Sequence, residues 1–379
     1  MTKKSMGQYF TKNKLLQNKV FEFILNKPDI ILEPSFGQGH LVKYITEHMN
    51  VKFDMFEIDD KIDILDNLDS NNIIYSDFLK YDIKNYYKTI IGNPPFIKTK
   101  TGNMYLDFIH KCYNLLCDNG ELIFIIPSDF FKLTRSRHIL NTMLENGSFT
   151  HIYNPNNESL FSNASIDILI FRYCKNKDLE HNILYNDELL YIKNNDGFIV
   201  FDKDKESYKK KVEDLFNIYV GIVNGKEQVF KNEDYGNIIM LDSSRKYSKY
   251  ILIEKYPTSN EELNKYLHEH KEVLINRKIR KFNYNNWWEW GALRNIKIME
   301  KKKDCECIYI HTMTRKSEIA FKGKVGYFGG SLIMLLPKTN IDLDKYINYF
   351  NSIDFRRNFT YSKRFKIAQR QLCKSYLNE

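Results

Sequence analysis

The sequence predicts an α/β fold in its first half, with helices packed on both faces of a mostly parallel sheet. Short apolar runs alternate there with helix-length amphipathic stretches, which is typical of strands that are buried on both sides. Glycine-rich or acidic residues follow several of these runs, where open parallel sheets usually bind their ligands. The alternation stops after Tyr173, so the second half is expected to form a different, α+β domain.

The individual elements follow from the length and period of the apolar residues. Short apolar runs predict strands over residues 29–34, 52–57, 73–75, 89–92, 121–127 and 166–173. Apolar residues spaced by three and four predict helices over 14–25, 41–48 and 105–116. We expect a first domain over 1–175, a polar and charged connector over 176–215, and a second domain over 216–379.

Composition excludes several classes of protein. The 379 residues are enough for two domains, and a hydrophobic content of 43% argues against wholesale disorder. No apolar run approaches the roughly 20 residues that cross a bilayer, and residues 1–7 lack the apolar core of a signal peptide. The six cysteines are scattered without metal-ligand spacing, so no metal site is expected. We therefore predict a cytoplasmic protein without a membrane partner, and the net charge of +9 is compatible with a polyanionic one.

A glycine turn follows the first predicted strand. Gly37 and Gly39 allow the backbone to approach a ligand closely, and the next helix begins directly after them. Glu57 ends the second strand about 20 residues later, where doubly wound folds bind ribose hydroxyls. The third glycine of a dinucleotide fingerprint is missing, which favours a cofactor with a single nucleoside over NAD.

Two further strand ends carry candidate binding groups. Asp77 and Phe78 follow the third strand and are suited to an adenine amino group and ring. The fourth strand ends in residues 93–96, with the sequence Asn-Pro-Pro-Phe. Consecutive prolines fix the backbone there, so the Asn93 side chain and the Pro94 carbonyl are expected to offer acceptors to one amino group, beside the ring of Phe96.

These motifs resemble the class I S-adenosylmethionine-dependent methyltransferases, and among them the TaqI-like, or gamma-order, DNA adenine-N6 methyltransferases. The similarity comprises residues 7–11 (Gly-Gln-Tyr-Phe-Thr), the glycine turn over 32–39, Glu57, residues 77–78, and the tetrapeptide at 93–96. Lys12 stands where these enzymes commonly have proline, and Phe96 where tyrosine is commoner. Segments 120–131 and 160–173 are similar to later motifs of the family.

The resemblance implies a Rossmann-like, seven-stranded catalytic domain, followed by an α+β target-recognition domain. It implies a site-specific, adenine-specific DNA methyltransferase of a restriction–modification system, or an orphan or viral enzyme, that uses S-adenosylmethionine and flips its target base from duplex DNA. The implied catalytic residues are Asn93, Pro94, Pro95 and Phe96, with Phe96 and Phe161 stacking on the target base. The implied cofactor-binding residues are Tyr9, Thr11, Glu33, Pro34, Gly37, Gly39, Glu57, Ile58, Asp77, Phe78 and Asn93.

Basic and aromatic residues cluster in the second half and predict contacts with DNA. Basic side chains neutralise phosphates, while arginine and aromatic groups also read or wedge the duplex. The predicted DNA-binding residues are Arg277, Lys278, Arg280, Lys281, Trp287 and Arg294. We expect a monomer that acts on double-stranded DNA. No nuclease-like carboxylate–lysine cluster stands out in the sequence, so any cognate restriction endonuclease is expected on a separate chain.

Two alternatives remain open at the level of sequence. The first is an rRNA adenine-N6 methyltransferase, since residues 7–11 and 37–40 also suit the rRNA adenine dimethylases. Those enzymes, however, usually have isoleucine or leucine in place of Pro94 and carry only a small helical C-terminal domain. The second is a catalytically idle DNA-binding protein, against which the intact polar groups of Asn93, Asp77 and Glu57 argue.

Overall fold

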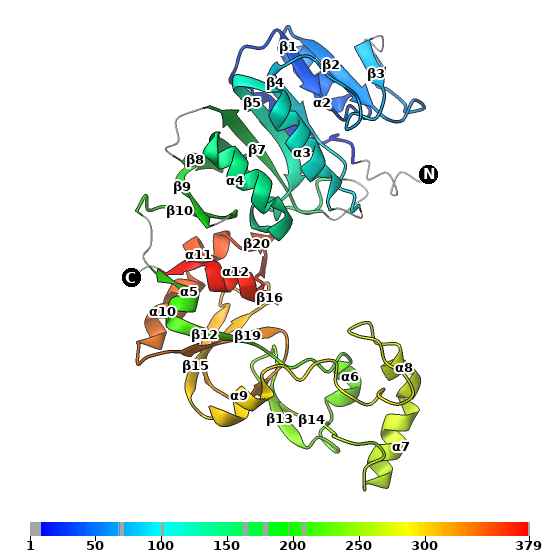
Figure 1. Cartoon of the computed structure of the whole chain (residues 1–379), viewed down its shortest axis with the longest axis vertical. Coiled ribbons are helices and arrows are strands. Elements are labelled where there is room, and N and C mark those ends of the chain that lie inside the picture. The colour runs from blue at the N-terminus through cyan, green and yellow to red at the C-terminus, as the bar shows by residue number, and fades with distance from the viewer. Residues whose placement is uncertain are drawn as a thin grey trace. The chain divides into compact units, whose positions relative to one another are not determined.

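The computed structural model describes residues 9–66, 68, 72–99, 102–161, 166–176, 181–195, 197–206 and 210–377 (Figure 1). Gly7 and Gln8, which open the first motif, lie outside the described residues. The chain divides into two compact units. Unit 1 comprises Met1–Ser207 and Thr360–Lys363, and unit 2 comprises Tyr208–Phe359 and Arg364–Glu379.

Unit 1 is built on a ten-stranded sheet with the order β10-β9-β8-β6-β7-β5-β4-β1-β2-β3. Its strands are β1 (Ile30–Glu33), β2 (Lys52–Glu57), β3 (Ile73–Tyr75), β4 (Tyr87–Gly92), β5 (Leu116–Pro127), β6 (Gly147–Tyr153), β7 (Ile168–Lys175), β8 (Asn182–Tyr185), β9 (Glu188–Asn195) and β10 (Phe198–Asp202). Strands β3, β2, β1, β4 and β5 are parallel neighbours, and β7 runs antiparallel between β5 and β6. This arrangement confirms the predicted Rossmann-like fold, but the sheet has ten strands instead of the predicted seven.

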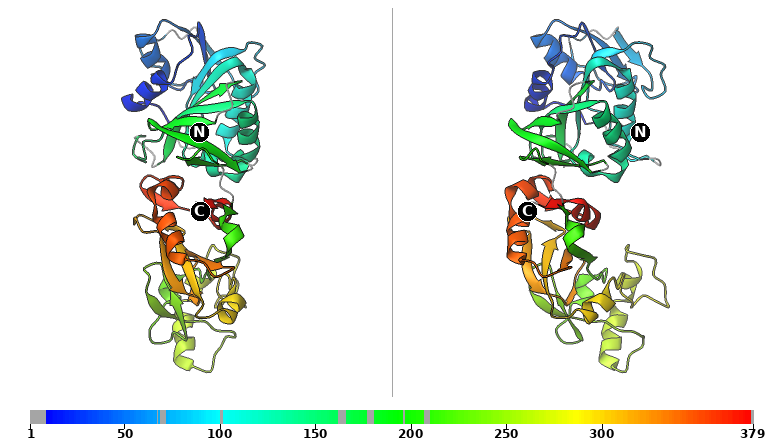
Figure 2. Two further views of the ribbon diagram at one scale, coloured as in Figure 1. Left: turned by 90° about the vertical axis from the view of Figure 1, so that its left-hand side faces the viewer. Right: turned by 60° about the vertical axis from the view of Figure 1, so that its left-hand side comes forward.

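Helices cover both faces of this sheet, as Figure 2 shows. They are α1 (Lys14–Glu22), α2 (His40–His48), α3 (Met104–Leu115) and α4 (Arg137–Glu145). Successive residues of each central strand point to opposite faces, so Ile31 packs in the core of α1 and α2, while Leu32 packs in the core of α3 and α4. In β4, Ile91 likewise packs in the core of α1 and α2, and Ile90 packs in the core of α3 and α4. The strands are buried on both faces, which explains their continuous apolar runs.

The predicted connector over 176–215 differs from the structure. Strands β8, β9 and β10 fall within it and extend the sheet of unit 1, with β8 paired to β6. Exposed side chains such as Leu184 and Leu189 alternate with buried ones in β8 and β9, so these two strands lack the continuous apolar run that marks the central strands. Residues 198–201 of β10 do form a short buried apolar run, but it was not predicted as a strand. The boundary between the units therefore lies near Ser207, later than the predicted end of the first domain at residue 175.

A buried ion pair joins β5 to β7. The Glu121 and Arg172 side chains are 0% and 4% exposed, and their Oε2 and Nη2 atoms lie 2.7 Å apart. Glu121 also accepts hydrogen bonds from the Thr89 hydroxyl and from the backbone N–H groups of Leu25 and Asn26. One carboxylate thereby connects β4, β5, β7 and the segment after α1.

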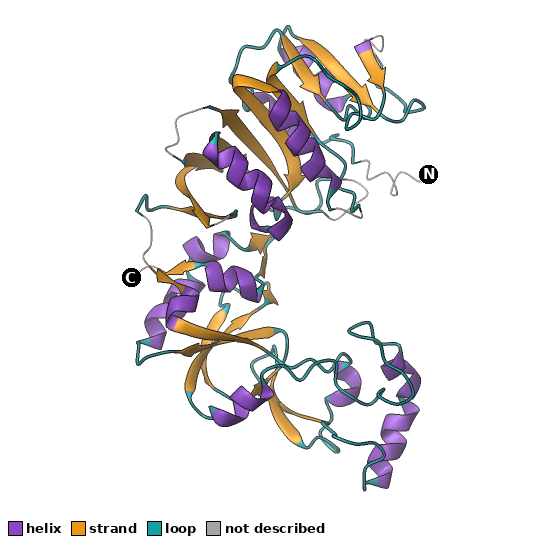
Figure 3. Ribbon diagram, in the orientation of Figure 1, coloured by secondary structure: helices purple, strands orange, loops and turns teal. Residues whose placement is uncertain are grey.

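Unit 2 is an α+β unit, as predicted for the second half. Its main sheet has the order β12-β19-β15-β17, and a smaller one has the order β14-β13-β18. Figure 3 distinguishes the helices of the chain from its strands by colour. The helices are α5 (Val212–Leu215), α6 (Glu227–Phe230), α7 (Glu261–Glu269), α8 (Lys271–Ile275), α9 (Ile296–Lys301), α10 (Leu343–Asn351), α11 (Ile353–Arg357) and α12 (Gln369–Lys374). The strands are β11 (Lys210–Lys211), β12 (Phe216–Val220), β13 (Ile238–Leu241), β14 (Tyr247–Tyr250), β15 (Glu306–His311), β16 (Met313–Thr314), β17 (Ala320–Lys324), β18 (Tyr327–Phe328), β19 (Leu332–Pro337), β21 (Arg364–Lys366) and β22 (Tyr376–Leu377). A further short strand, β20 (Thr360–Tyr361), belongs to unit 1. Among the described residues, no helix has the length and apolar character needed to span a membrane.

The Glu121–Arg172 pair predicts a large effect of an uncompensated charge. Arg172→Met leaves the Glu121 carboxylate buried without its counter-charge and should lower the free energy of unfolding by about 3–5 kcal/mol. Adding Glu121→Gln to that variant should recover part of the loss, because a neutral amide needs no counter-charge. Urea unfolding followed by circular dichroism measures both effects. A loss below about 1 kcal/mol in Arg172→Met would show that the pair contributes little.

Candidate active site

A cavity of about 510 Å³ lies at the carboxyl ends of four adjacent strands, β4, β1, β2 and β3. The chain leaves β1 toward β2 on one side and β4 toward β5 on the other, so the cavity lies at the point where the strand order reverses, the usual ligand site of such sheets. Nine of the residues predicted from sequence line it: Tyr9, Pro34, Gly37, Glu57, Ile58, Asp77, Phe78, Asn93 and Pro95. Thr11 and Glu33 line a smaller cavity of about 30 Å³, which also touches Tyr9, Gly37 and Asn93.

Glu57 and the glycine turn form one hydrogen-bonded unit. The Glu57 carboxylate accepts from the backbone N–H groups of Gly37, Ile58 and Asp59 at 2.8–2.9 Å. Gly37 has a φ of +60°, and a Cβ on it would lie 3.3 Å from the ring of Phe10. Burial raises the pKa of Glu57, and these N–H donors oppose the shift. A carboxylate has roughly four acceptor positions, so one remains for a ligand hydroxyl.

The other walls of the cavity combine apolar rings with negative charge. Phe56, Phe78 and Phe108 supply apolar surface, and Ile58 is 67% exposed directly after the buried Glu57. Asp59, Asp60 and Asp77 add carboxylates, of which Asp77 also pairs with Lys80 at 3.1 Å. No lysine or arginine lines this cavity in the described part of the chain. The lining therefore suits a nucleoside that carries positive charge better than one that carries phosphates.

Glu33 is a buried carboxyl beside this cavity. It is 1% exposed, and its Oε1 atom accepts from the backbone N–H and the hydroxyl of Ser35. Burial raises its pKa to about 8, and the charge of Glu57 adds to the shift. A cationic group placed next to Glu33 would favour its ionised form.

Asn93, which directly follows β4, holds its side-chain amide in one orientation. Its Nδ2 atom donates to the backbone carbonyl of Tyr9 at 2.5 Å and to the Thr11 hydroxyl at 3.1 Å. The Oδ1 atom is buried, and no partner for it is found among the described residues. Since both amide hydrogens are used, Oδ1 is an oriented acceptor that still needs a donor.

The structure brings Phe96 and Phe161 together, but not as two parallel walls. Their ring centroids are 6.5 Å apart and their planes are inclined by 75°. The ring of Tyr9 contacts both, at 5.7 Å from Phe96 and 5.8 Å from Phe161. The predicted stacking pair is therefore part of a three-ring cluster. Gly39, with a φ of +85°, precedes the first turn of α2 and does not line either cavity.

In unit 2, two of the predicted DNA-binding residues are structural. Arg277 is 7% exposed and donates to the carbonyls of Leu274, Asn224, Trp287 and Glu289, and burial lowers its pKa to about 10. Trp287 is 1% exposed. The prediction that Arg277 and Trp287 contact DNA is wrong for this conformation, because their side chains are enclosed. Arg280 is exposed and pairs with Glu289 at 2.5 Å, and Lys278, Lys281 and Arg294 are exposed.

Several cavity residues were not predicted from the sequence. They are Phe10, Ser35, Phe56, Asp59, Asp60, Ser76, Leu79, Ile97, Met104 and Phe108. Asp59 and Asp60 lie two and three residues after Glu57, and this closeness in sequence could have indicated that they line the same cavity. Met104 and Phe108 lie on α3, where an apolar residue that lines a cavity has the same sequence signature as one in the core.

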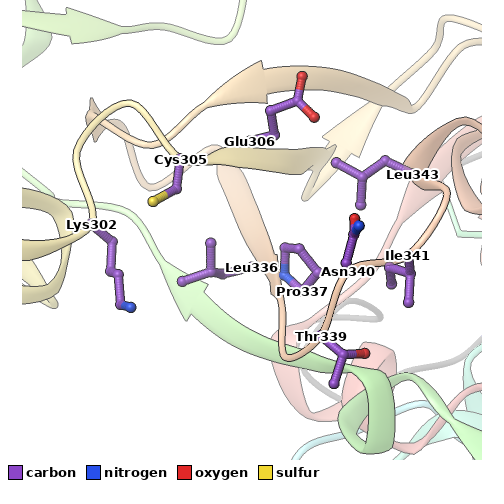
Figure 4. A pocket seen from close by; sticks show the side chains of 9 residues that line it. All are labelled: Lys302, Cys305, Glu306, Leu336, Pro337, Thr339, Asn340, Ile341 and Leu343. Carbon is purple, nitrogen blue, oxygen red and sulfur yellow. The ribbon is translucent and has the colours of Figure 1, made fainter.

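A second cavity, of about 340 Å³, lies in unit 2 (Figure 4). Side chains from the turn after α9, the start of β15, the end of β19 and the segment leading to α10 surround it. They include Lys302, Cys305 and Glu306 beside apolar residues such as Leu336 and Leu343. We assign no ligand to this cavity.

The strand order and the cavity at the reversal point define unit 1 as a class I methyltransferase fold. Residues 8–161 match the sequence model of the Eco57I restriction-modification methylase. The chain is homologous to type II methyltransferases. It is 26% identical to M.HindII of Haemophilus influenzae, over 79% of this chain and 73% of that protein. It is 30% identical to M.HincII, also of Haemophilus influenzae, over 51% of this chain and 42% of that protein.

One solved structure is similar across both units. The Type IIL restriction-modification enzyme MmeI, determined in complex with DNA, aligns with a TM-score of 0.57 at 10% identity. The alignment covers 95% of this chain and 63% of the MmeI chain. At this level of identity the similarity establishes a shared fold.

The buried Glu33 predicts a pH-dependent stability. Its pKa is about 8 in the folded chain and near 4.5 when unfolded, so its contribution is complete below pH 4.5 and is lost as the pH rises to 8. Relative to Glu33→Gln, the unmodified protein should lose up to about 1.4 kcal/mol of stability per pH unit in that window. Differential scanning calorimetry from pH 5 to 9 measures the difference. If the melting temperatures of the two proteins changed in parallel with pH, the raised pKa of Glu33 would be contradicted.

Proposed function

We propose that this protein transfers the methyl group of S-adenosylmethionine to the N6 amino group of adenine in duplex DNA. The observation that carries the proposal is the oriented, unpartnered Oδ1 atom of Asn93 at the rim of a cavity suited to a cationic nucleoside. The type II methyltransferase relatives support DNA as the substrate. The setting we propose is the modification half of a restriction–modification system, or an orphan or viral methylase, with any endonuclease on a separate chain.

The cofactor is held by the residues of the larger cavity. Glu57 accepts a ribose hydroxyl at its remaining acceptor position, while Ile58, Phe78 and Phe108 cover the adenine ring. Carboxylates around the cavity match the positive charges of the methionine portion. When bound, S-adenosylmethionine supplies an electrophilic methyl group on a sulfonium.

The target adenine must leave the duplex to reach this site, at a cost of a few kcal/mol. Stacking on an aromatic ring recovers roughly 1–3 kcal/mol, and Phe96 is the ring that follows Asn93 and the two prolines. Asn93 Oδ1 accepts one amino hydrogen and the Pro94 carbonyl the other, which turns the nitrogen lone pair toward the methyl group. As the new N–C bond forms and the S–C bond breaks, the methylated nitrogen becomes cationic and then releases a proton.

Unit 2 selects the DNA sequence in this proposal. A long loop joins α8 to α9, and the Arg277 guanidinium holds it from within by binding carbonyls of three chain segments. The ring of Phe282 packs 3.8 Å from that guanidinium. Lys278, Lys281 and Arg294 extend from the same loop to solvent, where they are suited to phosphates. Arg277 thus keeps the loop in shape, and the exposed cations contact the duplex.

The proposal predicts that Asn93→Ala abolishes methyl transfer. Loss of one oriented hydrogen-bonding group in a transition state costs on the order of 10²- to 10³-fold in rate. Incorporation of tritiated methyl groups from S-adenosylmethionine into unmethylated genomic DNA measures the rate. Thr11→Val is the matched control: it removes one of the two groups that orient Asn93 but keeps the acceptor, so its loss should be smaller.

Single-molecule sequencing of DNA from cells that express the protein then identifies the modified base and its context. We expect N6-methyladenine at one short sequence with the unmodified protein, and none with Asn93→Ala. Methylation by Asn93→Ala at the rate of the unmodified protein would refute the mechanism. A modified cytosine, or methyl transfer into ribosomal RNA instead of DNA, would refute the substrate.

A second prediction distinguishes residues that contact phosphates from Arg277, which stabilises the loop between α8 and α9. Lys278→Ala with Lys281→Ala should weaken DNA binding and reduce the slope of log K against log salt by about two units, close to 0.9 for each lost phosphate contact. Lys301→Ala with Lys303→Ala removes the same charge from α9 and the turn after it, and should change the slope less. Arg277→Ala should instead lower the melting temperature of unit 2. Fluorescence anisotropy across a salt series measures the slopes, and calorimetry measures the melting temperature. Equal slopes for the two double variants would contradict the proposal that Lys278 and Lys281 contact phosphates.

A further inference from the structure

The ring of Tyr9 lies next to Phe96, the ring on which the target base is proposed to stack. Its ring stacks on Phe96 with the planes inclined by 27°, and it also contacts Phe161. A base that stacks on Phe96 must approach one face of that ring to about 3.5 Å. The centroids of Tyr9 and Phe96 are 5.7 Å apart, less than the roughly 7 Å that an intervening base needs, so no base fits between these two rings while Tyr9 keeps this rotamer.

The relative tilt of Phe96 and Phe161 also indicates that no base fits between these rings in this conformation. A base between two rings requires nearly parallel planes about 7 Å apart, twice the contact distance. The centroids of Phe96 and Phe161 are 6.5 Å apart, which is close to that separation, but their planes are inclined by 75°. Tyr9 contacts both rings, so its position is coupled to their tilt.

The backbone of Tyr9 is fixed while its side chain is less constrained. The Tyr9 carbonyl accepts the hydrogen bond from Asn93 Nδ2, and the Lys12 N–H donates to the carbonyl of Phe10. The side chain is only partly buried and borders both cavities of unit 1. A rotation about the side-chain torsions therefore moves the ring without disturbing the bond that orients Asn93.

We propose that the Tyr9 ring occupies the target-base position on Phe96 and competes with the flipped base for it. The ring rotates away as the base enters, and it covers the apolar face of Phe96 at other times. Tyr9 is then a substrate-selectivity residue: a base gains the site only if its own stacking and its hydrogen bond to Asn93 exceed the Tyr9 contacts. This inference rests on the proposed function, because the competing ligand is the target base.

The test compares the full-length protein with Tyr9→Ala and Tyr9→Phe. The probe is a duplex with 2-aminopurine in place of the methylated adenine, at the sequence found by single-molecule sequencing, with S-adenosylmethionine saturating. Aromatic contacts of this kind amount to a factor of about 2 to 10 in an equilibrium constant. Tyr9→Ala should therefore lower KM for the adenine-containing duplex by that factor. It should also lower, by the same factor, the protein concentration that gives half-saturation of the 2-aminopurine fluorescence. Tyr9→Phe keeps a ring beside Phe96, so both values should change less than in Tyr9→Ala.

Two results for Tyr9→Ala would contradict competition between Tyr9 and the target base. A higher KM with weaker 2-aminopurine fluorescence in Tyr9→Ala would show that Tyr9 is a wall of the base site, and unchanged values would show that it does not compete; either result overturns the proposal. Tyr9→Leu, which keeps apolar bulk without a stacking face, gives the same comparison if Tyr9→Ala does not fold. If the unmodified protein methylates no DNA, the proposed function fails together with this inference, whereas methylation without the Tyr9 effect refutes this inference alone.

Discussion

The hydrogen bonds that orient the Asn93 amide are the interaction on which the candidate site depends. Both amide hydrogens are bound by the segment before α1, through the Tyr9 carbonyl and the Thr11 hydroxyl, so the oxygen is left as an acceptor. Two prolines follow directly and fix the backbone at the end of β4. An acceptor that is buried without a donor is costly, and such a cost is typical of groups kept for a ligand.

The same sheet edge separates two chemical environments. Around the larger cavity, carboxylates at the ends of β2 and β3 face apolar rings, which suits a cationic nucleoside. Around Phe96, three aromatic rings form a nearly uncharged surface, which suits a neutral base. Asn93 borders the cavity and lies next to Phe96 in sequence. In the proposed reaction, methyl transfer takes place where these two environments meet.

The sequence predicted the central strands well because burial on both faces leaves continuous apolar runs, as in β1, β5 and β7. It also indicated that Glu57, Asp77 and Asn93 lie together, because each was placed at the carboxyl end of its own strand, and all three line the larger cavity. It did not predict β8 and β9, whose exposed residues interrupt the apolar pattern, or β10, whose short buried run lies within the predicted connector. Nor could it predict that Arg277 is enclosed by four carbonyls while its neighbour Lys278 is exposed, since a basic run does not reveal which cation turns inward. The position of Tyr9 between two distant phenylalanines depends on tertiary packing alone.

The most direct test of the central claim is a crystal structure of the protein with the unreactive cofactor analogue sinefungin and a duplex that contains its recognition sequence. The proposed mechanism predicts an extrahelical adenine whose exocyclic nitrogen lies about 2.9 Å from Asn93 Oδ1, within hydrogen-bond distance. It also predicts that this base stacks on Phe96 and that the analogue contacts Glu57. A base that stays within the duplex, or an extrahelical base whose amino group is bound elsewhere, would contradict the role of Asn93 as the acceptor for the target amino group.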